Sequence, residues 1–189
     1  MNASKIISFV VLATLVIGGI AYLNSQKVSR DMVGGKVDVQ TTMNKEEKER
    51  KYQVAKEITT PDEFINTGGM PVTIGEFVGK KVVLLDIWTY SCINCQRTTP
   101  YLNAWYGKYK DDGLVIIGLH TPEFEFEKVY QNVVDATKRL KIQYPVVLDN
   151  DYSTWTAYQN RFWPRKYLID IDGFIVYDHI GEGGYEETE

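Results

Sequence analysis

The sequence predicts an α/β fold, a mixed sheet flanked by helices, from three observations. Residues 82–88 and 114–119 are nearly continuous apolar runs rich in β-branched residues, which is typical of strands covered on both faces. Helical patterns follow both runs, over residues 92–110 and 126–140. Asp172-Gly173 separates two further strand-like runs, 167–171 and 174–180, which is typical of a β-hairpin. Strands that alternate with helices and end in a hairpin indicate a sheet with an antiparallel end.

The remaining elements are shorter. The segment Thr60-Pro61-Asp62-Glu63 supplies an N-cap, a proline for the first helical position and acids for the first turn, so it predicts a short helix. Residues 145–148 are expected to form a short strand and residues 154–158 a short helix. Residues 186–189 have the composition of a helix start. We therefore expect the final helix of the domain to be truncated there.

The composition excludes several classes of protein. Of the 189 residues, 44% are hydrophobic, which is too apolar for a disordered chain. Two cysteines are too few for a disulfide-rich scaffold or a four-thiolate zinc site. The net charge of −4 argues against nucleic-acid binding, because that function needs a basic surface.

Charge and hydropathy divide the chain into three parts. Residues 6–23 carry no charge, and a helix of that length rises about 27 Å, close to the roughly 30 Å of a membrane's hydrocarbon core. We therefore expect an N-terminal membrane anchor over residues 1–25, with a cleaved signal peptide as the alternative. Residues 26–56 mix charges without an apolar stripe and are expected to form a charged, solvated tether. Residues 57–189 are acidic and are expected to form the domain that carries the chemistry.

Both cysteines lie in one motif, Cys92-Ile93-Asn94-Cys95, directly after a predicted strand and at the start of the next helix. The free N–H groups of a helix N-terminus favour a thiolate, so we expect Cys92 to have a lowered pKa and to be the nucleophile. The spacing lets Cys95 close a disulfide with Cys92 across one helical turn, which indicates thiol–disulfide exchange without a metal or other cofactor. The alternatives are two inert thiols and a zinc half-site, for which His120 and His179 are the only histidines.

Asp86 lies in the middle of the first predicted strand, six residues before Cys92. A buried carboxylate is costly unless it is paired or protonated, and burial raises its pKa. Such a group can accept the proton of the second cysteine when that cysteine attacks a mixed disulfide. We therefore expect Asp86 to act as a general base, with a capping role at the strand end as the alternative.

The segment Asp86–Cys95 resembles the active-site segment of thioredoxins, with the buried aspartate, the tryptophan and the C-x-x-C motif at matching spacings. Pro100 matches the proline that kinks the active-site helix of that family, and Trp163-Pro164 resembles the segment that holds its cis-proline. The resemblance implies that Pro164 is cis and that the Trp163 backbone pairs with a bound substrate chain. The strand–helix–strand over residues 114–148 resembles the insertion of TlpA/ResA-like proteins and redoxins. The implied fold is thioredoxin-like with this insertion.

Four segments are more specifically similar to the thioredoxin-like domain of DipZ proteins. These segments are Trp88–Cys95, His120–Lys128, Leu148–Tyr152 and Gly181–Tyr185, and the resemblance covers about residues 64–189. DipZ proteins carry this domain outside the membrane, attached to a CcdA-type membrane domain that carries electrons. The sequence contains no such multi-span region, so the resemblance implies a separate CcdA/DsbD-like membrane protein as electron donor.

The resemblance also implies roles for residues around the cysteines. Glu123 follows the second predicted strand, where TlpA/ResA-like proteins place an acid near their cysteines. It would tune the thiol pKa values, or it belongs with Glu125 and Glu127 to an ordinary acidic loop. Four aromatic residues would border the disulfide and contact an apolar stretch of substrate, or else serve in packing: Trp88, Tyr90, Phe162 and Trp163.

Together these features predict a membrane-anchored thiol–disulfide oxidoreductase that reduces protein disulfides, with its catalytic domain on the extracytoplasmic side, where such disulfides exist. Cys92 would attack the substrate disulfide, and Cys95, assisted by Asp86, would resolve the mixed disulfide. The direction of electron flow depends on a reduction potential that the residues do not fix. Apocytochrome c, a methionine sulfoxide reductase and misoxidised secreted proteins are all candidate substrates.

Two other functions fit parts of the sequence. Thr89-Tyr90-Ser91-Cys92 matches the T-x-x-C part of the redoxin-type thiol peroxidase pattern, but Trp88 and Ile87 stand where that pattern expects a proline. The non-enzymatic alternative is a tethered binding module with a structural disulfide or metal.

Overall fold

The computed structural model of the chain describes residues 43–189. The expected membrane anchor, residues 1–25, and the tether up to residue 42 lie outside the described residues. Among residues 43–189, no helix is both long enough and apolar enough to cross a membrane.

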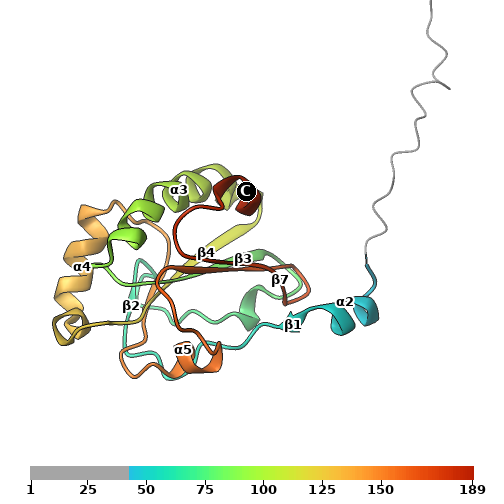
Figure 1. Cartoon of the computed structure of the whole chain (residues 1–189), viewed down its shortest axis with the longest axis horizontal. Coiled ribbons are helices and arrows are strands. Elements are labelled where there is room, and N and C mark those ends of the chain that lie inside the picture. The colour runs from blue at the N-terminus through green and yellow to red at the C-terminus, as the bar shows by residue number, and fades with distance from the viewer. Residues whose placement is uncertain (1–42) are drawn as a thin grey trace, which may run out of the picture. The chain divides into compact units, whose positions relative to one another are not determined.

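A single mixed sheet of seven strands organises the described residues, in the order β1-β7-β6-β3-β4-β5-β2 (Figure 1). The strands are β1 Gln53–Val54, β2 Phe64–Ile65, β3 Val82–Trp88, β4 Leu114–His120, β5 Val146–Leu148, β6 Arg165–Ile169 and β7 Phe174–Ile180. β3, β4 and β5 run parallel, whereas β6 pairs antiparallel with both β3 and β7. The predicted α/β fold, with a mixed sheet and an antiparallel hairpin at one end, is confirmed.

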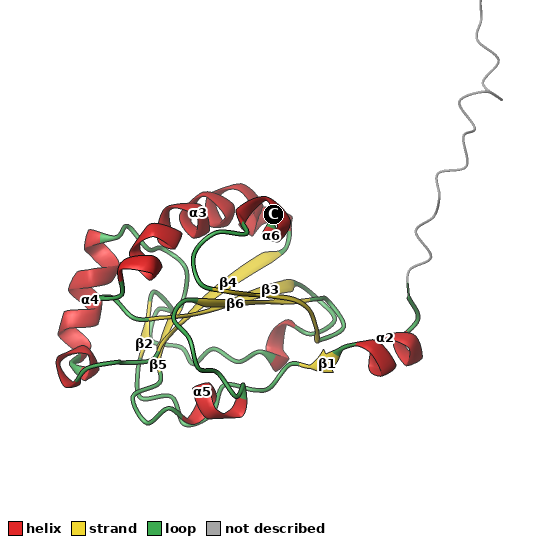
Figure 2. Ribbon diagram, in the orientation of Figure 1, coloured by secondary structure: helices red, strands yellow, loops and turns green. Residues whose placement is uncertain are grey.

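Helices cover both faces of the sheet. They are α2 Lys45–Lys51, α3 Ile93–Tyr109, α4 Tyr130–Arg139, α5 Ser153–Ala157 and α6 Tyr185–Thr188, with short 3-10 turns at Gly75–Phe77, Lys110–Asp112 and Glu125–Lys128. In Figure 2, α3 and α6 lie on one face of the sheet and α5 lies on the other. Pro100, which the thioredoxin resemblance singled out, lies inside α3.

The alternation of side chains along β3 builds two cores. Leu84 and Trp88 point to the α3 face and join a cluster that includes Cys95 and Leu102. The odd-numbered residues of β3 point to the opposite face, where they pack with side chains from the N-terminal segment and from around α5. Full burial of one such side chain contributes about 1.5–3 kcal/mol, so the register of β3 is strongly fixed. By this parity Asp86 faces α3, the helix that begins at the cysteine motif.

The helix predicted after Thr60 is absent, and this prediction was wrong. Phe64 and Ile65 instead form β2, which pairs antiparallel with β5. The Asp62 N–H donates to the Leu148 carbonyl at 3.0 Å, and the Asp62 carboxylate accepts from the Asn150 N–H at 2.7 Å. Asp62 therefore binds the backbone at and just after the end of β5. Pairing of residues 64–65 with this sheet edge outweighs the local preference for a helix.

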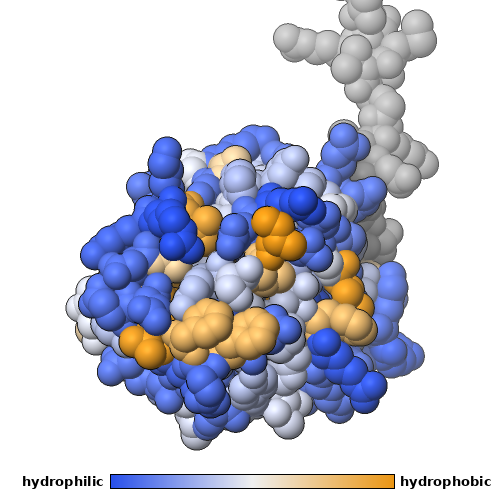
Figure 3. All heavy atoms as spheres, turned by 60° about the vertical axis from the view of Figure 1, so that its left-hand side comes forward, coloured by the Kyte–Doolittle hydropathy of each residue, from blue (hydrophilic) through white to orange (hydrophobic). Residues whose placement is uncertain are grey.

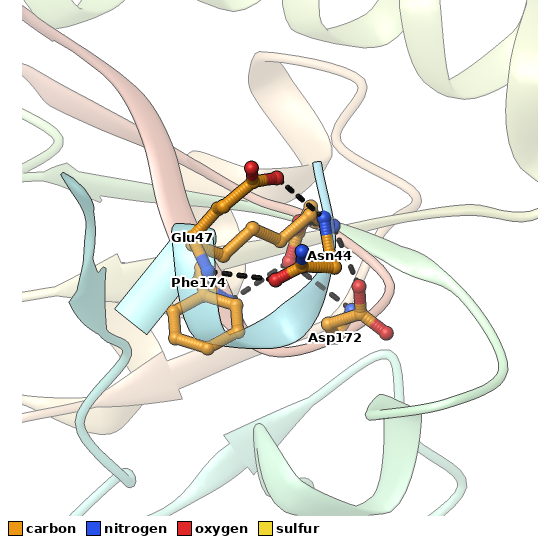
Figure 4. A network of polar contacts seen from close by, with 6 residues as sticks. Asn44, Glu47, Asp172 and Phe174 are labelled. Carbon is orange, nitrogen blue, oxygen red and sulfur yellow. Dashed lines mark hydrogen bonds and ion pairs between the residues drawn. The ribbon is translucent and has the colours of Figure 1, made fainter. Parts of the chain in front are cut away.

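The last part of the expected tether, residues 44–56, differs from a solvated spacer. Asn44 and Glu47 form a capping box at the start of α2 (Figure 4), and β1 pairs with β7. The ammonium of Lys48 lies 2.6 Å from a carboxylate oxygen of both Asp170 and Asp172, in the turn between β6 and β7. This segment therefore packs on the domain, because β7 offers a free edge and the turn offers two carboxylates.

Candidate active site

The end of β3 leads through residues 89–91 directly into α3, and Cys92 is the N-cap of that helix. Its backbone is extended, and its Sγ accepts a hydrogen bond from the Cys95 N–H at 3.3 Å. Cys92 is half-buried and Cys95 is buried, and both thiols are free. The structure therefore brings the two cysteines together at the helix N-terminus, with one of them accessible.

The surroundings of Cys92 favour its thiolate. A hydrogen bond with the Cys95 thiol, together with the backbone N–H groups of Cys95 and Asn94, lowers the pKa of Cys92 to about 6 against the opposing effect of burial. Cys92 is therefore largely ionised at pH 7, which is the state required of a nucleophile.

Cys95 has the opposite character. Burial, and secondly its contact with the Cys92 thiol, raises the pKa of Cys95 far above its usual range. A buried thiol of this kind attacks only if a neighbouring group accepts its proton.

Asp86 is the candidate for that group. It is 3% exposed, and its Oδ1 has no hydrogen-bond partner among the described residues. Burial raises the pKa of Asp86 to about 7, with the positive charge of Lys166 opposing this rise and the charge of Cys92 adding to it. A carboxyl group with a pKa near 7 can both accept and release a proton at neutral pH.

Lys166 was not singled out in the sequence, yet it is fully buried. It occupies β6 directly opposite Asp86 in the antiparallel register, and its Nζ donates to the Gly181 carbonyl at 3.2 Å. Burial lowers the pKa of Lys166, against the opposing effect of the Asp86 charge. Parity along β6 could have revealed this residue, because Lys166 shares a face with Leu168, which packs in the α3-side core.

The Trp163–Pro164 peptide bond is cis, as the resemblance implied. The Trp163 side chain packs against the cluster that contains Cys95, and its Nε1 donates to the Thr121 carbonyl at 3.0 Å. The Pro164 carbonyl accepts from the Gly181 N–H at 2.8 Å. This segment thus joins the end of β4 to the residues that follow β7, beside the core under α3.

The aromatic residues expected to contact substrate differ in exposure. Trp88 is only 1% exposed, so the expectation that it contacts substrate is corrected: it is a core side chain. Tyr90 is half-exposed, stacks on His120 with ring centroids 5.6 Å apart, and donates its hydroxyl to the Phe126 carbonyl at 3.2 Å. Phe162 is 48% exposed and Trp163 is half-buried. Tyr90, Phe162 and Trp163 therefore remain available to a substrate.

Glu123 and Glu127 have distinct roles. The negative charge of Glu123 makes a small contribution that raises the pKa of Cys92. Glu127, which the sequence grouped with an ordinary acidic loop, is fully buried. Its carboxylate accepts backbone N–H groups from Ser91 at 3.2 Å, Glu123 at 2.6 Å and Phe124 at 2.9 Å. Burial pulls the pKa of Glu127 upward, but these hydrogen bonds, with the Thr89 side chain, outweigh it and hold the pKa below its usual value.

His120 and Thr89 are buried next to residues 90–91, which lead into the cysteine motif. His120 is fully buried, and burial lowers its pKa to about 4, so the ring is neutral at pH 7. Its Nε2 lies 3.4 Å from the Thr89 Oγ1, and Thr89 is itself fully buried. The hydroxyl of Thr89, the threonine of the peroxidase-like pattern, therefore contacts His120 inside the protein and is not exposed to solvent. Across residues 43–189, no group of three His, Cys, Asp or Glu side chains is arranged to hold a metal ion.

Comparison with known proteins gives relatives of the same kind. The family model named Redoxin matches residues 51–189. The protein DipZ of Mycobacterium bovis is 52% identical over 127 residues, which cover 67% of this chain and 18% of DipZ. The chain therefore spans less than a fifth of the length of that relative.

Two further proteins match over most of their own length. The thiol-disulfide oxidoreductase ResA of Bacillus thuringiensis is 31% identical over 144 residues, which cover 75% of this chain and 78% of ResA. The solution structure of a thiol:disulfide interchange protein from Bacteroides sp. superposes with a TM-score of 0.58 at 29% identity, covering 73% of this chain and 87% of that one. With its paired thiols at the start of α3 and its cis-proline before β6, the chain belongs to the redoxin family, among the thioredoxin-like thiol–disulfide oxidoreductases of the ResA and DipZ type.

Proposed function

We propose that the domain reduces disulfides in protein substrates through the Cys92/Cys95 dithiol. The observation that carries this proposal is the contrast between the two thiols. Cys92 is accessible at a helix N-terminus with a pKa of about 6, whereas Cys95 is buried with a raised pKa and lies on the face to which Asp86 points. This contrast assigns attack to Cys92 and resolution to Cys95.

The reaction transfers two electrons from the dithiol to the substrate. The Cys92 thiolate attacks one sulfur of the substrate disulfide, forming a mixed disulfide and releasing the other sulfur as a thiolate, which takes a proton from solvent. Cys95 then gives its proton to the Asp86 carboxylate and attacks the Cys92 Sγ. The second substrate sulfur leaves and is protonated, and the enzyme is left with a Cys92–Cys95 disulfide.

Trapping of the mixed disulfide tests this proposal. Cys95→Ser should remain covalently bound to substrate proteins through Cys92, and a dithiol should release them. Cys92→Ser is the matched control and should trap nothing. Equal trapping by both variants would overturn the assignment. Rapid peroxide consumption by Cys95→Ser would instead establish the peroxidase alternative, because that chemistry needs only one peroxidatic thiol.

The same proposal includes where the domain lies relative to the membrane and which class of protein supplies its electrons. The uncharged stretch over residues 6–23 and the similarity to DipZ support a single-pass anchor with the domain on the extracytoplasmic side. As part of this proposal, a CcdA/DsbD-like membrane protein supplies the electrons that re-reduce the Cys92–Cys95 disulfide. Labelling intact cells with a membrane-impermeant thiol reagent checks the location: Cys92 should react without lysis, and protection until lysis would place the domain inside.

A further inference from the structure

We propose that the loop over residues 121–128, here called the aromatic loop, recognises a large apolar side chain close to the target cysteine of an extended polypeptide substrate. This inference rests on the proposed function and adds the class of substrate. Phe124 and Phe126 are 49% and 51% exposed, and their rings stack with centroids 5.4 Å apart and an interplanar angle of 9°. Figure 3, which looks toward the side where α4 lies, shows adjoining exposed apolar side chains on this surface.

The aromatic loop is held in place by hydrogen bonds to its backbone. Glu127 binds the N–H groups of Glu123 and Phe124 from within the protein. The Phe126 carbonyl accepts both from the Asn132 side chain at 2.9 Å and from the Tyr90 hydroxyl at 3.2 Å. Exposed rings on a backbone fixed in this way are pre-organised, so binding them costs little conformational entropy. That arrangement suits recognition, whereas two unpartnered phenylalanines on a loose loop would only add an aggregation hazard.

The aromatic loop is continuous with the cysteine site. Glu127 also accepts the N–H of Ser91, the residue before Cys92, and the Tyr90 and Phe126 rings lie 6.1 Å apart. At its other end, the Thr121 carbonyl accepts from the indole of Trp163, next to the cis-proline. A polypeptide whose sulfur reaches Cys92 can therefore extend across Tyr90 onto Phe126 and Phe124. The aromatic loop is therefore positioned to bind the substrate chain itself.

Charge narrows the class of substrate. Glu125 is paired with Lys128 at 2.7 Å, whereas Glu123, whose charge reaches Cys92, forms no ion pair within residues 43–189. Residues 57–189 as a whole hold 12 Lys and Arg against 20 Asp and Glu. The preferred segment therefore has an aromatic or large aliphatic side chain near its cysteine and lacks acidic residues there, because like charges disfavour association.

Peptide disulfides that differ at one residue test this inference. Three matched peptides carry Phe, Ala or Glu beside the oxidised cysteine, and kcat/KM for reduction is measured with a small dithiol to regenerate the enzyme. We expect the wild-type protein to prefer the Phe peptide to the Ala peptide about tenfold, equal to about 1.4 kcal/mol, and to reduce the Glu peptide slowest. In Phe124→Ala/Phe126→Ala the Phe-to-Ala ratio should fall to about one or two. Because the outcome is a ratio, partial loss of folded protein does not change it.

Ile171→Ala provides the matched control, since Ile171 is 45% exposed and follows the end of β6 remote from Pro164. This variant should keep the tenfold ratio. A wild-type ratio near one, or a double variant that keeps the preference, would overturn the inference while leaving disulfide reduction intact. If the protein reduced no disulfide at all, the proposed function would fail separately. Binding of serine-for-cysteine peptides to Cys92→Ser/Cys95→Ser, followed by fluorescence anisotropy, would then decide the inference, with loss of the Phe preference counting against it.

Discussion

Lys166 lies directly across from Asp86 in the antiparallel pairing of β6 with β3, and both side chains are buried on the face covered by α3. Side chains opposite each other in such a pair have Cβ atoms about 4.5–5.5 Å apart. Three other ionisable groups interact with the charge of Asp86: Cys92 at the N-cap of α3, Cys95 within α3, and the buried Tyr144. Lys166 is the one cation in this set. Its charge opposes the larger effect of burial on the pKa of Asp86 and so increases the fraction of Asp86 that is ionised when Cys95 has to lose its proton.

Removal of this cation should shift the pH dependence of resolution. Without the ammonium, Lys166→Met should raise the pKa of Asp86 further, so less carboxylate is available at pH 7. We expect the acid limb of the resolution rate to move upward by about one pH unit. Two successive thiolate releases from a chromogenic aromatic disulfide separate attack by Cys92 from resolution by Cys95. Lys81→Met, at an exposed lysine before β3, should leave the profile unchanged, and an unshifted profile in Lys166→Met would contradict the role.

Replacement of Asp86 should slow catalysis and stabilise the fold. Asp86→Asn should lower the resolution rate about 10²- to 10⁴-fold while leaving attack by Cys92 nearly unchanged, because only resolution needs the base. The pKa of Asp86 is raised by folding to about 7 from its ordinary value near 3.9, so ionisation opposes folding. This penalty is absent below pH 4, grows between pH 4 and 7, and is constant above.

Urea unfolding at two pH values checks the second half of this prediction. At pH 8, Asp86→Asn should be more stable than the wild-type protein by up to about 4 kcal/mol, and at pH 5 by much less. Equal stability at pH 8 would show that Asp86 is not a strained, buried acid.

The thiol of Cys95 should control the acidity of Cys92. Hydrogen bonding from that thiol is the largest effect lowering the pKa of Cys92, so Cys95→Ala should raise the midpoint of Cys92 alkylation from about pH 6 toward the ordinary value near 8.5. The rate of iodoacetamide alkylation as a function of pH measures this midpoint. Asn94→Ala is the control: Asn94 acts through its backbone N–H, so its variant should keep the midpoint near 6. A shift in both variants would point to a general loosening of the helix start.

Local sequence patterns predicted the parts of the fold that depend on one segment alone. The apolar runs became β3 and β4, and Asp172-Gly173 became the turn between β6 and β7. The motif between strand and helix located Cys92 and Cys95, because a helix N-terminus is a local feature. The helix expected at Thr60 failed because an edge of the sheet, formed by distant residues 146–148, competes for the same backbone.

Contacts between segments that are distant in the sequence determined the features that the sequence did not reveal. Parity along β6 puts Lys166 on the same face as Leu168, but only the register shows that it lies opposite Asp86. Glu127 resembles its exposed neighbour Glu125, because only the approach of the 89–91 turn supplies the Ser91 N–H to its carboxylate. Trp88 was expected either to border the disulfide and contact substrate or to serve in packing, and as the last residue of β3 it points into the core.

The carboxylate of Glu127 should stabilise the turn that carries Cys92. In Glu127→Gln one carboxylate oxygen becomes an NH₂ donor that faces backbone N–H groups, which should cost about 1–3 kcal/mol. Glu125→Gln, at a side chain that is 88% exposed, should change stability by less than about 0.5 kcal/mol. Because folding lowers the pKa of Glu127, its stabilisation is full above the unfolded pKa and is lost as pH falls through the folded pKa. Urea unfolding at pH 7 and pH 4 should therefore show a smaller gap between these variants at pH 4.

Close packing of Gly118 against Trp88 should make that glycine irreplaceable. Gly118 pairs with Asp86 from the β4 side, and a Cβ there would lie 2.9 Å from the Trp88 Nε1 and 3.2 Å from the Tyr144 ring. Both neighbours are buried, so neither can move aside without disturbing the core beneath the cysteines. Gly118→Ala should therefore destabilise the domain by about 1–3 kcal/mol.

Gly107→Ala supplies the opposite control, because a Cβ at this position in α3 meets no atom within 4 Å. Alanine in a helix interior is more favourable than glycine by about 0.5–1 kcal/mol, so this variant should be more stable than the wild-type protein. Thermal unfolding of both variants measures the contrast. If Gly118→Ala matched Gly107→Ala, the Trp88 indole and the Tyr144 ring would have room to move away from an added Cβ, and the close packing at Gly118 would not limit stability.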